Sequence, residues 1–192
     1  MLKEFEIKIP VNDLEHVEKN LRRLGAIFIG FYEEQDYYLD MRPCIDLMLI
    51  DSALRIRLTK DLINGGVASE LTFKGPKERH EFAKIRKEIT VTIDSGEKML
   101  DIFKSLGFNI AAVVLKKRKI FRHNNYRIYL DDVESLGKFV EIEFVSENEK
   151  ISGIEEELTD LVNILDLPKV FISKSYLELL LEKKLQIFTS KS

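Results

Sequence analysis

Charged side chains recur at every second position in several stretches of this sequence, and their types are suited to binding a metal ion beside a phosphate group. The first stretch, residues 3–10, alternates Glu4, Glu6 and Lys8 with apolar residues. Successive side chains of an extended chain point to opposite faces, so these three charged groups share one face. This spacing brings two carboxylates to a single metal ion or a single partner.

The same alternation returns in later stretches, and it yields two sets of candidate site residues. Arginine binds phosphate oxygens through two parallel N–H groups, and lysine acts as a point charge. Neighbouring carboxylates would repel a bare polyphosphate, unless they hold a divalent cation that bridges to it. Oxygen-only ligands favour Mg²⁺ or Mn²⁺. The pattern therefore predicts a metal-dependent polyphosphate site. The acids are Glu4, Glu6, Glu88, Asp131, Glu141 and Glu143, and the bases are Lys8, Arg55, Arg57, Lys74, Arg86, Lys116 and Arg118.

Eight predicted strands carry these residues. Alternation, β-branched residues and turn signals place the strands at residues 3–10, 26–40, 52–60, 67–74, 82–93, 113–122, 126–132 and 138–145. We expect Gly75-Pro76 to end the fourth strand and residues 77–81 to form a charged loop. Apolar residues at helical spacing predict helices at about 12–24, 95–106, 152–165 and 175–187, with Gly25 and Gly107 as stops for the first two.

These elements predict an α+β fold in which an eight-stranded antiparallel sheet closes into a barrel. The apolar strand faces would pack under amphipathic helices on the outside, and the charged faces would line the interior. Burying many ions in a dry interior costs several kcal/mol for each ion, so the interior must be wet, internally paired or built for a charged ligand. The alternative is an open sheet whose charged face is simply in contact with solvent.

Length and composition narrow the class of protein. The chain has 192 residues, so we expect a single domain, 1–192, that includes the C-terminal helices. A net charge of −3 argues against nucleic-acid binding through bulk positive charge, and the single cysteine excludes a disulfide framework. No signal peptide or membrane span is recognisable, so we expect a cytoplasmic protein without a membrane partner. The last helix is a candidate contact for a homodimer.

Eight motifs, in order over nearly the whole chain, resemble those of the CYTH superfamily, the triphosphate tunnel metalloenzymes. They are Glu4-x-Glu6-x-Lys8, Gln35-Asp36-x-Tyr38, Leu54-Arg55-Ile56-Arg57, the Leu71–Pro76 segment, Arg86-x-Glu88, Lys116-x-Arg118 with Phe121, the Leu130–Glu143 block and Lys174-Ser175-Tyr176-x-Glu178-Leu179-Leu180. Phe121 departs from the family pattern, which has tyrosine there.

The resemblance implies roles for the motif residues in a tunnel that binds triphosphate and divalent metal. Glu4, Glu6, Glu141 and Glu143 would bind Mg²⁺ or Mn²⁺, while Glu88 and Asp131 would help a second metal or orient water. Lys174 would close over the ligand. Phosphate oxygens would be held by Lys8, Arg55, Arg57, Lys74, Arg86, Lys116 and Arg118, of which Lys8 and Arg57 would also serve catalysis.

Three functions remain open on sequence alone. Members of the family include thiamine, inorganic and RNA triphosphatases and class IV adenylyl cyclases. We favour hydrolysis of the terminal phosphate of a small triphosphate, because no motif marks an adenine pocket. The first alternative is conversion of ATP to cyclic AMP and pyrophosphate. The second is a binding module that sequesters polyphosphate or nucleotide without turnover.

Overall fold

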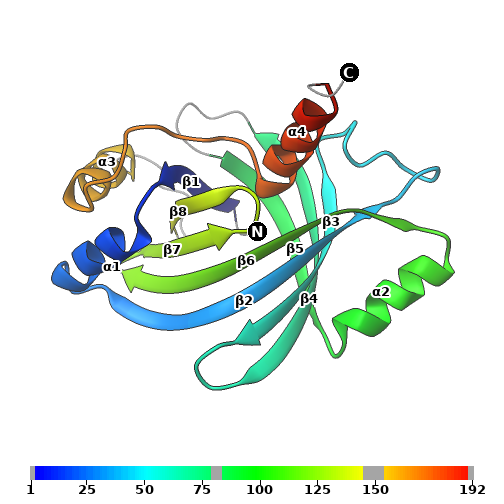
Figure 1. Cartoon of the computed structure of the whole chain (residues 1–192), viewed down its shortest axis with the longest axis horizontal. Coiled ribbons are helices and arrows are strands. Elements are labelled where there is room, and N and C mark those ends of the chain that lie inside the picture. Colours follow the sequence, from blue (N-terminus) through cyan, green and yellow to red (C-terminus); the bar gives the residue numbers. More distant parts are fainter. Residues whose placement is uncertain (1–2, 79–83, 145–153, 190–192) are drawn as a thin grey trace.

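The computed structural model is a closed antiparallel β-barrel with four helices (Figure 1). It describes residues 3–78, 84–144 and 154–189, without the side chains at positions 3–5, 78, 84–85, 154–155 and 187–188. The strands follow one another around the barrel in the order β1-β5-β4-β3-β2-β6-β7-β8. Their bounds are β1 Lys3–Val11, β2 Ile27–Asp40, β3 Ala53–Asp61, β4 Gly66–Glu78, β5 Lys84–Ile93, β6 Asn109–His123, β7 Tyr126–Val133 and β8 Gly137–Phe144. The predicted eight-stranded fold is confirmed.

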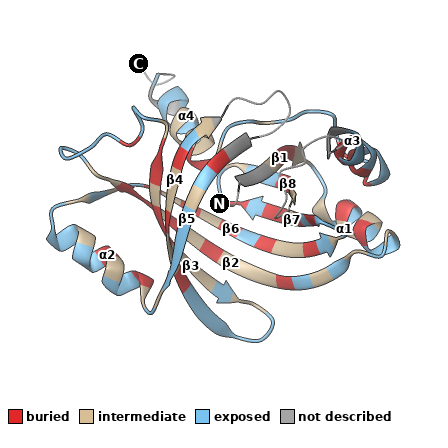
Figure 2. Cartoon of the chain, turned by 180° about the vertical axis from the view of Figure 1, so that it is seen from behind, coloured by how far each residue is buried: buried red, intermediate tan, exposed pale blue. Residues whose placement is uncertain are grey.

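Three helices cover the outer apolar faces of the strands, as the sequence predicts. Helices α1 (Leu14–Arg23) and α3 (Ile154–Ile164) bury side chains such as Leu21 and Leu161 against outward-facing residues of β1, β6, β7 and β8. Helix α2 (Gly96–Ser105) packs Leu100 on β3 and β4. Figure 2 shows the burial that alternates along β2 and β6 beneath them. Within the described part of the chain, no helix combines the length and apolar composition of a membrane span.

Local signals set the ends of the first two helices. The Asp13 carboxylate caps α1 by accepting hydrogen bonds from the backbone N–H groups of Glu15 and His16, at 2.9 and 3.2 Å, so the cap is one residue later than the sequence suggests. Ser95 caps α2 in the same way. Gly25 and Gly107 follow the two helices with φ of 77° and 90°, a conformation that glycine adopts without strain.

The fourth strand continues where the sequence predicts its end. Proline has no N–H to donate to a neighbouring strand, so Gly75-Pro76 reads as a terminator. In the structure the pairing of β4 with β5 shifts register between Lys74 and Lys77, and the strand then runs to Glu78. The freed backbone N–H of Lys77 donates to Asp51 Oδ2 at 2.8 Å. A β-bulge therefore carries the strand through residues 77–78 of the predicted loop, and residues 79–81 of that loop lie outside the described residues.

Helix α4 (Tyr176–Thr189) has a different place from the other three. Toward one end of the barrel the inward faces of β2 and β6 change from charged to apolar, with Tyr38 on β2 and Ala112 and Val114 on β6. Tyr176 and Leu177, in the first turn of α4, pack on this apolar end. Figure 1 shows α4 at the top of the view, apart from α1 and α3 on the left and α2 on the lower right. The charged part of the interior is therefore bounded at one end by α4.

Candidate active site

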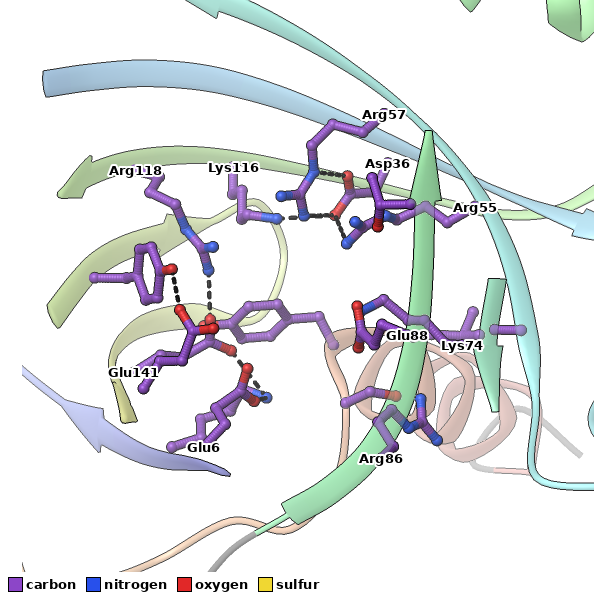
Figure 3. A pocket seen from close by; sticks show the side chains of 18 of the residues that line it. Glu6, Asp36, Arg55, Arg57, Lys74, Arg86, Glu88, Lys116, Arg118 and Glu141 are labelled. Atoms are coloured by element: carbon purple, nitrogen blue, oxygen red, sulfur yellow. Dashed lines mark hydrogen bonds and ion pairs between the residues drawn. The ribbon is translucent and has the colours of Figure 1, made fainter. Parts of the chain in front are cut away.

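The barrel encloses a charged cavity of about 300 Å³ (Figure 3). Among the described residues, eight basic and six acidic side chains line it, so the near balance of charge makes internal pairing possible. Every strand of the barrel contributes at least one lining or adjoining charged group, because alternation turns every second residue inward. The basic lining residues are Lys8, Arg55, Arg57, Lys74, Arg86, Lys116, Arg118 and Arg127, and the acidic ones are Glu6, Asp36, Glu70, Glu88, Glu141 and Glu143.

One wall, formed by β2, β3 and β6, carries three cations around Asp36. Arg57 grips this carboxylate with two N–H groups, at 2.6 Å from Nε to Oδ1 and 2.8 Å from Nη2 to Oδ2. Lys116 Nζ lies 2.8 Å from Oδ2, and Arg55 lies 3.8 Å from the same oxygen. Glu34 contacts Arg57 at 3.2 Å and Lys116 at 2.9 Å. We call these five residues the Asp36 cluster.

The Asp36 cluster keeps both carboxylates ionised. Burial alone would raise the pKa of Asp36, which is only 1% exposed, but Arg57, Lys116 and Arg55 outweigh burial and hold this pKa well below its usual value. Burial likewise opposes the ionisation of Glu34, yet Arg57 and Lys116 lower its pKa to about 2. Three cations against two carboxylates leave the cluster with a net positive charge.

The adjoining wall, formed by β1, β6, β7 and β8, holds a second network. Arg118 Nε donates to Asp131 Oδ1 at 2.7 Å, and Arg118 also contacts Glu141. Lys8 Nζ lies 3.1 Å from Glu141, and the hydroxyl of Tyr176 donates to Asp131 at 2.8 Å. We call these five residues the Asp131 cluster. Burial would lower the pKa of Lys8, but Glu141 and Glu6 outweigh it and raise this pKa.

Two more bases reach the cavity from β4 and β5. Lys74 forms an ion pair with Glu88, and Arg86 Nη2 donates to the backbone oxygen of Asp51 at 3.3 Å. Within the described residues, the buried Nε groups of Arg55 and Arg86 have no hydrogen-bond acceptor. A buried donor without a partner costs about 1–3 kcal/mol, so these two N–H groups favour an anionic ligand in the cavity.

Glu6 and Glu143 are the carboxylates best placed for a divalent cation. They are directly paired across β1 and β8, a position in which side chains lie about 5 Å apart at Cβ. Burial raises the pKa of Glu143, and the nearby charge of Glu6 adds to this rise. No group of three or more His, Cys, Asp or Glu side chains suited to a metal occurs in the described chain. Two carboxylates still fit Mg²⁺, which retains waters and shares phosphate oxygens.

The structure brings nearly all of the site residues predicted from sequence to this one cavity. Asp131 adjoins it but is 0% exposed and is engaged by Arg118 and Tyr176. Lys174 lies elsewhere: its side chain is 49% exposed and pairs with Glu182 at 2.7 Å. The side chain of Glu4 lies outside the described residues, although its backbone pairs with Arg86. The predicted residues that line the cavity are Glu6, Lys8, Arg55, Arg57, Lys74, Arg86, Glu88, Lys116, Arg118, Glu141 and Glu143.

Sequence reasoning missed several residues of the site, including the lining residues Glu70 and Arg127. Glu34 and Asp36 alternate with Gln35 on β2 and thus carry the same signal as the first strand, and Asp36 lies in the second motif, to which sequence reasoning gave no role. Tyr129 has its hydroxyl on Glu143 and its ring 4.2 Å from the Arg118 guanidinium. No local pattern places Tyr176 in the cavity, because its place depends on where α4 docks.

Comparison with known proteins identifies the family. The CYTH domain matches residues 2–176. The chain belongs to the CYTH domain family. Members of this family are enzymes, triphosphatases or adenylate cyclases, which act on triphosphate substrates and are generally metal-dependent.

The relatives of this chain cover more than nine-tenths of it. A Methanocaldococcus jannaschii protein named "putative adenylate cyclase MJ0240" is 36% identical over 178 residues, which are 92% of this chain and 97% of that protein. The PH1819 protein of Pyrococcus horikoshii is 36% identical, with a TM-score of 0.81 over 94% of this chain and 99% of that one. HpAC1 from Hippeastrum, at 16% identity and a TM-score of 0.68 over 92% and 93%, shares the fold.

Proposed function

We propose that this protein hydrolyses the terminal phosphate of inorganic triphosphate or of an organic triphosphate, with Mg²⁺ or Mn²⁺. The observation that carries the proposal is the pair of buried donors, Arg55 Nε and Arg86 Nε, that lack an acceptor in a cavity already lined by Arg57, Lys74 and other bases. Phosphate oxygens satisfy such donors, because arginine matches their geometry and charge.

Phosphoryl transfer depends mostly on positioning and charge neutralisation. In the proposed reaction a water oxygen attacks the terminal phosphorus in line, and the bond from that phosphorus to the bridging oxygen breaks. Orthophosphate leaves, and inorganic triphosphate yields pyrophosphate. Lys8 and Arg57 stabilise the charge on the terminal phosphoryl group from the two walls. Glu88, which forms an ion pair with Lys74, orients the water.

The two carboxylates that face each other across β1 and β8 complete the proposed site. Glu6 and Glu143 hold the divalent cation, whose contribution is to neutralise charge along the phosphate chain. Glu4 belongs to the same strand face by alternation, which makes it a third candidate ligand. Tyr129 orients Glu143 through its hydroxyl. The basic wall then faces the phosphates from the other side.

Adenylyl cyclase activity is the second candidate, and the name of the Methanocaldococcus relative favours it. In that reaction a ribose hydroxyl attacks the α-phosphorus and pyrophosphate leaves. The cavity volume of about 300 Å³ lies at the low end of the roughly 300–1,000 Å³ of ligand pockets, and its lining is mostly charged. Such a cavity suits a phosphate chain better than a nucleoside. HpAC1, which shares the fold, is described as having a dominant triphosphatase activity.

One incubation panel separates the candidates. The purified chain is mixed with inorganic triphosphate, thiamine triphosphate or ATP, each with Mg²⁺ and with Mn²⁺, and the products are separated and identified. We expect orthophosphate from at least one triphosphate and no cyclic AMP. Cyclic AMP and pyrophosphate as the main products from ATP would reverse the choice. Tight binding without turnover over hours would instead indicate a binding module.

A further inference from the structure

Tyr176 is the one tyrosine among the described residues that reaches the cavity from a helix. It is the first residue of α4 and is 5% exposed. Its ring packs edge-on against Phe139 of β8, with 5.2 Å between centroids and 62° between planes. Burial, followed by the charges of Asp131 and Glu141, raises the pKa of Tyr176, so the hydroxyl keeps its proton and remains a hydrogen-bond donor.

The Tyr176 hydroxyl donates a hydrogen bond to Asp131, and this carboxylate also binds Arg118. The hydroxyl oxygen lies 2.8 Å from Asp131 Oδ2. Asp131 is fully buried and receives two N–H groups of Arg118, of which Nε donates at 2.7 Å. The guanidinium group is planar, so fixing two of its nitrogens also fixes the direction of its remaining edge. Tyr176 thereby restrains Arg118, a cation that lines the cavity.

Residues 172–176, at the start of α4 and just before it, also restrain a second cation, Lys8. Lys8 Nζ donates to the backbone oxygen of Lys174 at 3.1 Å and lies 4.3 Å from the centre of the Tyr176 ring. The backbone N–H of Ile172 donates to the backbone oxygen of Lys8 at 2.9 Å. Lys8 and Arg118 come from β1 and β6, and the segment 172–176 contacts one directly and the other through Asp131.

We propose that Tyr176 is a positioning residue for phosphate binding, and that its hydroxyl sets the orientation of Arg118 through Asp131. This inference rests on the proposed function, because it presumes that Arg118 contacts a phosphate oxygen. It makes the docking of the C-terminal helix a condition for tight ligand binding. A preorganised cation loses less freedom on binding, and so binds more tightly, than one free to rotate.

A matched pair of substitutions tests the role. Tyr176→Phe removes only the hydroxyl and keeps the ring beside Lys8 and Phe139. Tyr126→Phe is the control, because this buried tyrosine on the outer face of β7 also donates its hydroxyl to a carboxylate, Glu157 at 2.7 Å. Calorimetric titration with inorganic triphosphate without metal gives Kd, and phosphate release with Mn²⁺ gives KM and kcat.

We expect Tyr176→Phe to raise the Kd for triphosphate about tenfold and to raise KM similarly, the size expected for a lost hydrogen bond to a charged group. Tyr126→Phe should lower the melting temperature but leave Kd within twofold of the wild type. If Tyr176→Phe also keeps the wild-type Kd and KM, the inference is overturned while the proposed function stands. If the wild type neither binds nor hydrolyses triphosphate, the proposed function falls as well.

A double-mutant cycle isolates the route through Asp131. Asp131→Asn alone should weaken triphosphate binding, and adding Tyr176→Phe to it should change Kd by less than twofold, because the carboxylate that relays the hydroxyl is gone. Near-ultraviolet circular dichroism checks that each variant retains its tertiary packing. A full tenfold loss from Tyr176→Phe in the Asp131→Asn background would contradict the proposed route.

Discussion

The Asp36 cluster and the Asp131 cluster adjoin each other along β6, which supplies Lys116 to the first and Arg118 to the second, and they compensate buried charge differently. In the closed strand order, β2 lies opposite β1 and β3 lies opposite β8. The Asp36 cluster sets three bases against two acids. The Asp131 cluster sets Lys8 and Arg118 against two acids, and Glu6 and Glu143 lie beside it. One wall therefore has surplus positive charge and the other surplus negative charge.

Under the proposed function, this difference gives each wall its own ligand. Surplus bases suit phosphate oxygens, and surplus carboxylates suit a divalent cation. Only a ligand that carries both, such as a metal-bound triphosphate, complements the two walls at once. The pairing within each wall also explains how the fold tolerates so many ions, because a buried ion with a hydrogen-bonded partner avoids most of the cost of a bare one.

The largest expected effect comes from neutralising the centre of the basic wall. Asp36→Asn leaves Arg57 and Lys116 buried with reduced compensation, and we expect the free energy of unfolding to fall by about 3–5 kcal/mol. Triphosphate should restore part of this loss, because its oxygens replace the missing charge. Urea unfolding with and without triphosphate measures both effects. The exposed cap substitution Asp13→Asn is the control, and equal stability of the two variants would contradict this account.

The next effect is a pH dependence located in Glu34. Its pKa falls from 4.5 to about 2 in the folded chain, so the ionised group stabilises the fold above pH 4.5 and this contribution is lost as the pH falls toward 2. The shift corresponds to about 3 kcal/mol. Unfolding followed across this pH range should show a shallower dependence in Glu34→Gln than in the wild type. Parallel stability curves for the two proteins would show that the neighbouring cations do not lower the pKa of Glu34.

A comparable effect should arise on the acidic wall, but only when metal is present. Glu143→Gln removes one of the two facing carboxylates, and we expect the concentration of Mn²⁺ that gives half-maximal activity to rise about 100-fold. Binding of triphosphate without metal should change little. Glu33→Gln is the matched control, because alternation turns Glu33 outward from the barrel. If Glu143→Gln leaves the dependence on Mn²⁺ unchanged, Glu143 is not a ligand of the metal.

The smallest effect concerns the ion pair that links α4 to β4. Lys77 contacts Glu178 of α4 and lies 3.4 Å from Asp51. Lys77→Ala should lower the free energy of unfolding by less than about 1 kcal/mol, because these groups are partly exposed to solvent. Its effect on triphosphate binding should be much smaller than that of Tyr176→Phe. A larger loss of binding would indicate that the contact between Lys77 and Glu178, and not the Tyr176 hydroxyl, links α4 to triphosphate binding.

Alternation predicted most of this site, because a strand's period of two fixes which residues share the interior. It placed Lys8, Arg57 and Glu141 on inward faces without any knowledge of the fold. It could not predict which cation each carboxylate would pair with, since that depends on register between strands far apart in sequence. Gly75-Pro76 misled because a bulge can accommodate a proline within a strand.

Helix docking was beyond the reach of any local pattern. The motif that contains Lys174 and Tyr176 suggested a role for the charged residue, whereas the structure turns the Lys174 side chain toward Glu182 and the Tyr176 ring into the cavity. Which side of a helix meets a site is decided by packing of the whole helix, here on the apolar end of the barrel. The roles of individual site residues stay predictions until they are tested.

Calorimetric titration of inorganic triphosphate, with and without Mg²⁺, tests the two-walled site most directly. The account predicts one triphosphate per chain, tighter binding with Mg²⁺, a loss of affinity in Arg57→Ala under both conditions, and a loss in Glu6→Gln only with Mg²⁺. Binding that is unchanged by Arg57→Ala, or that weakens equally in Glu6→Gln with and without Mg²⁺, would contradict it.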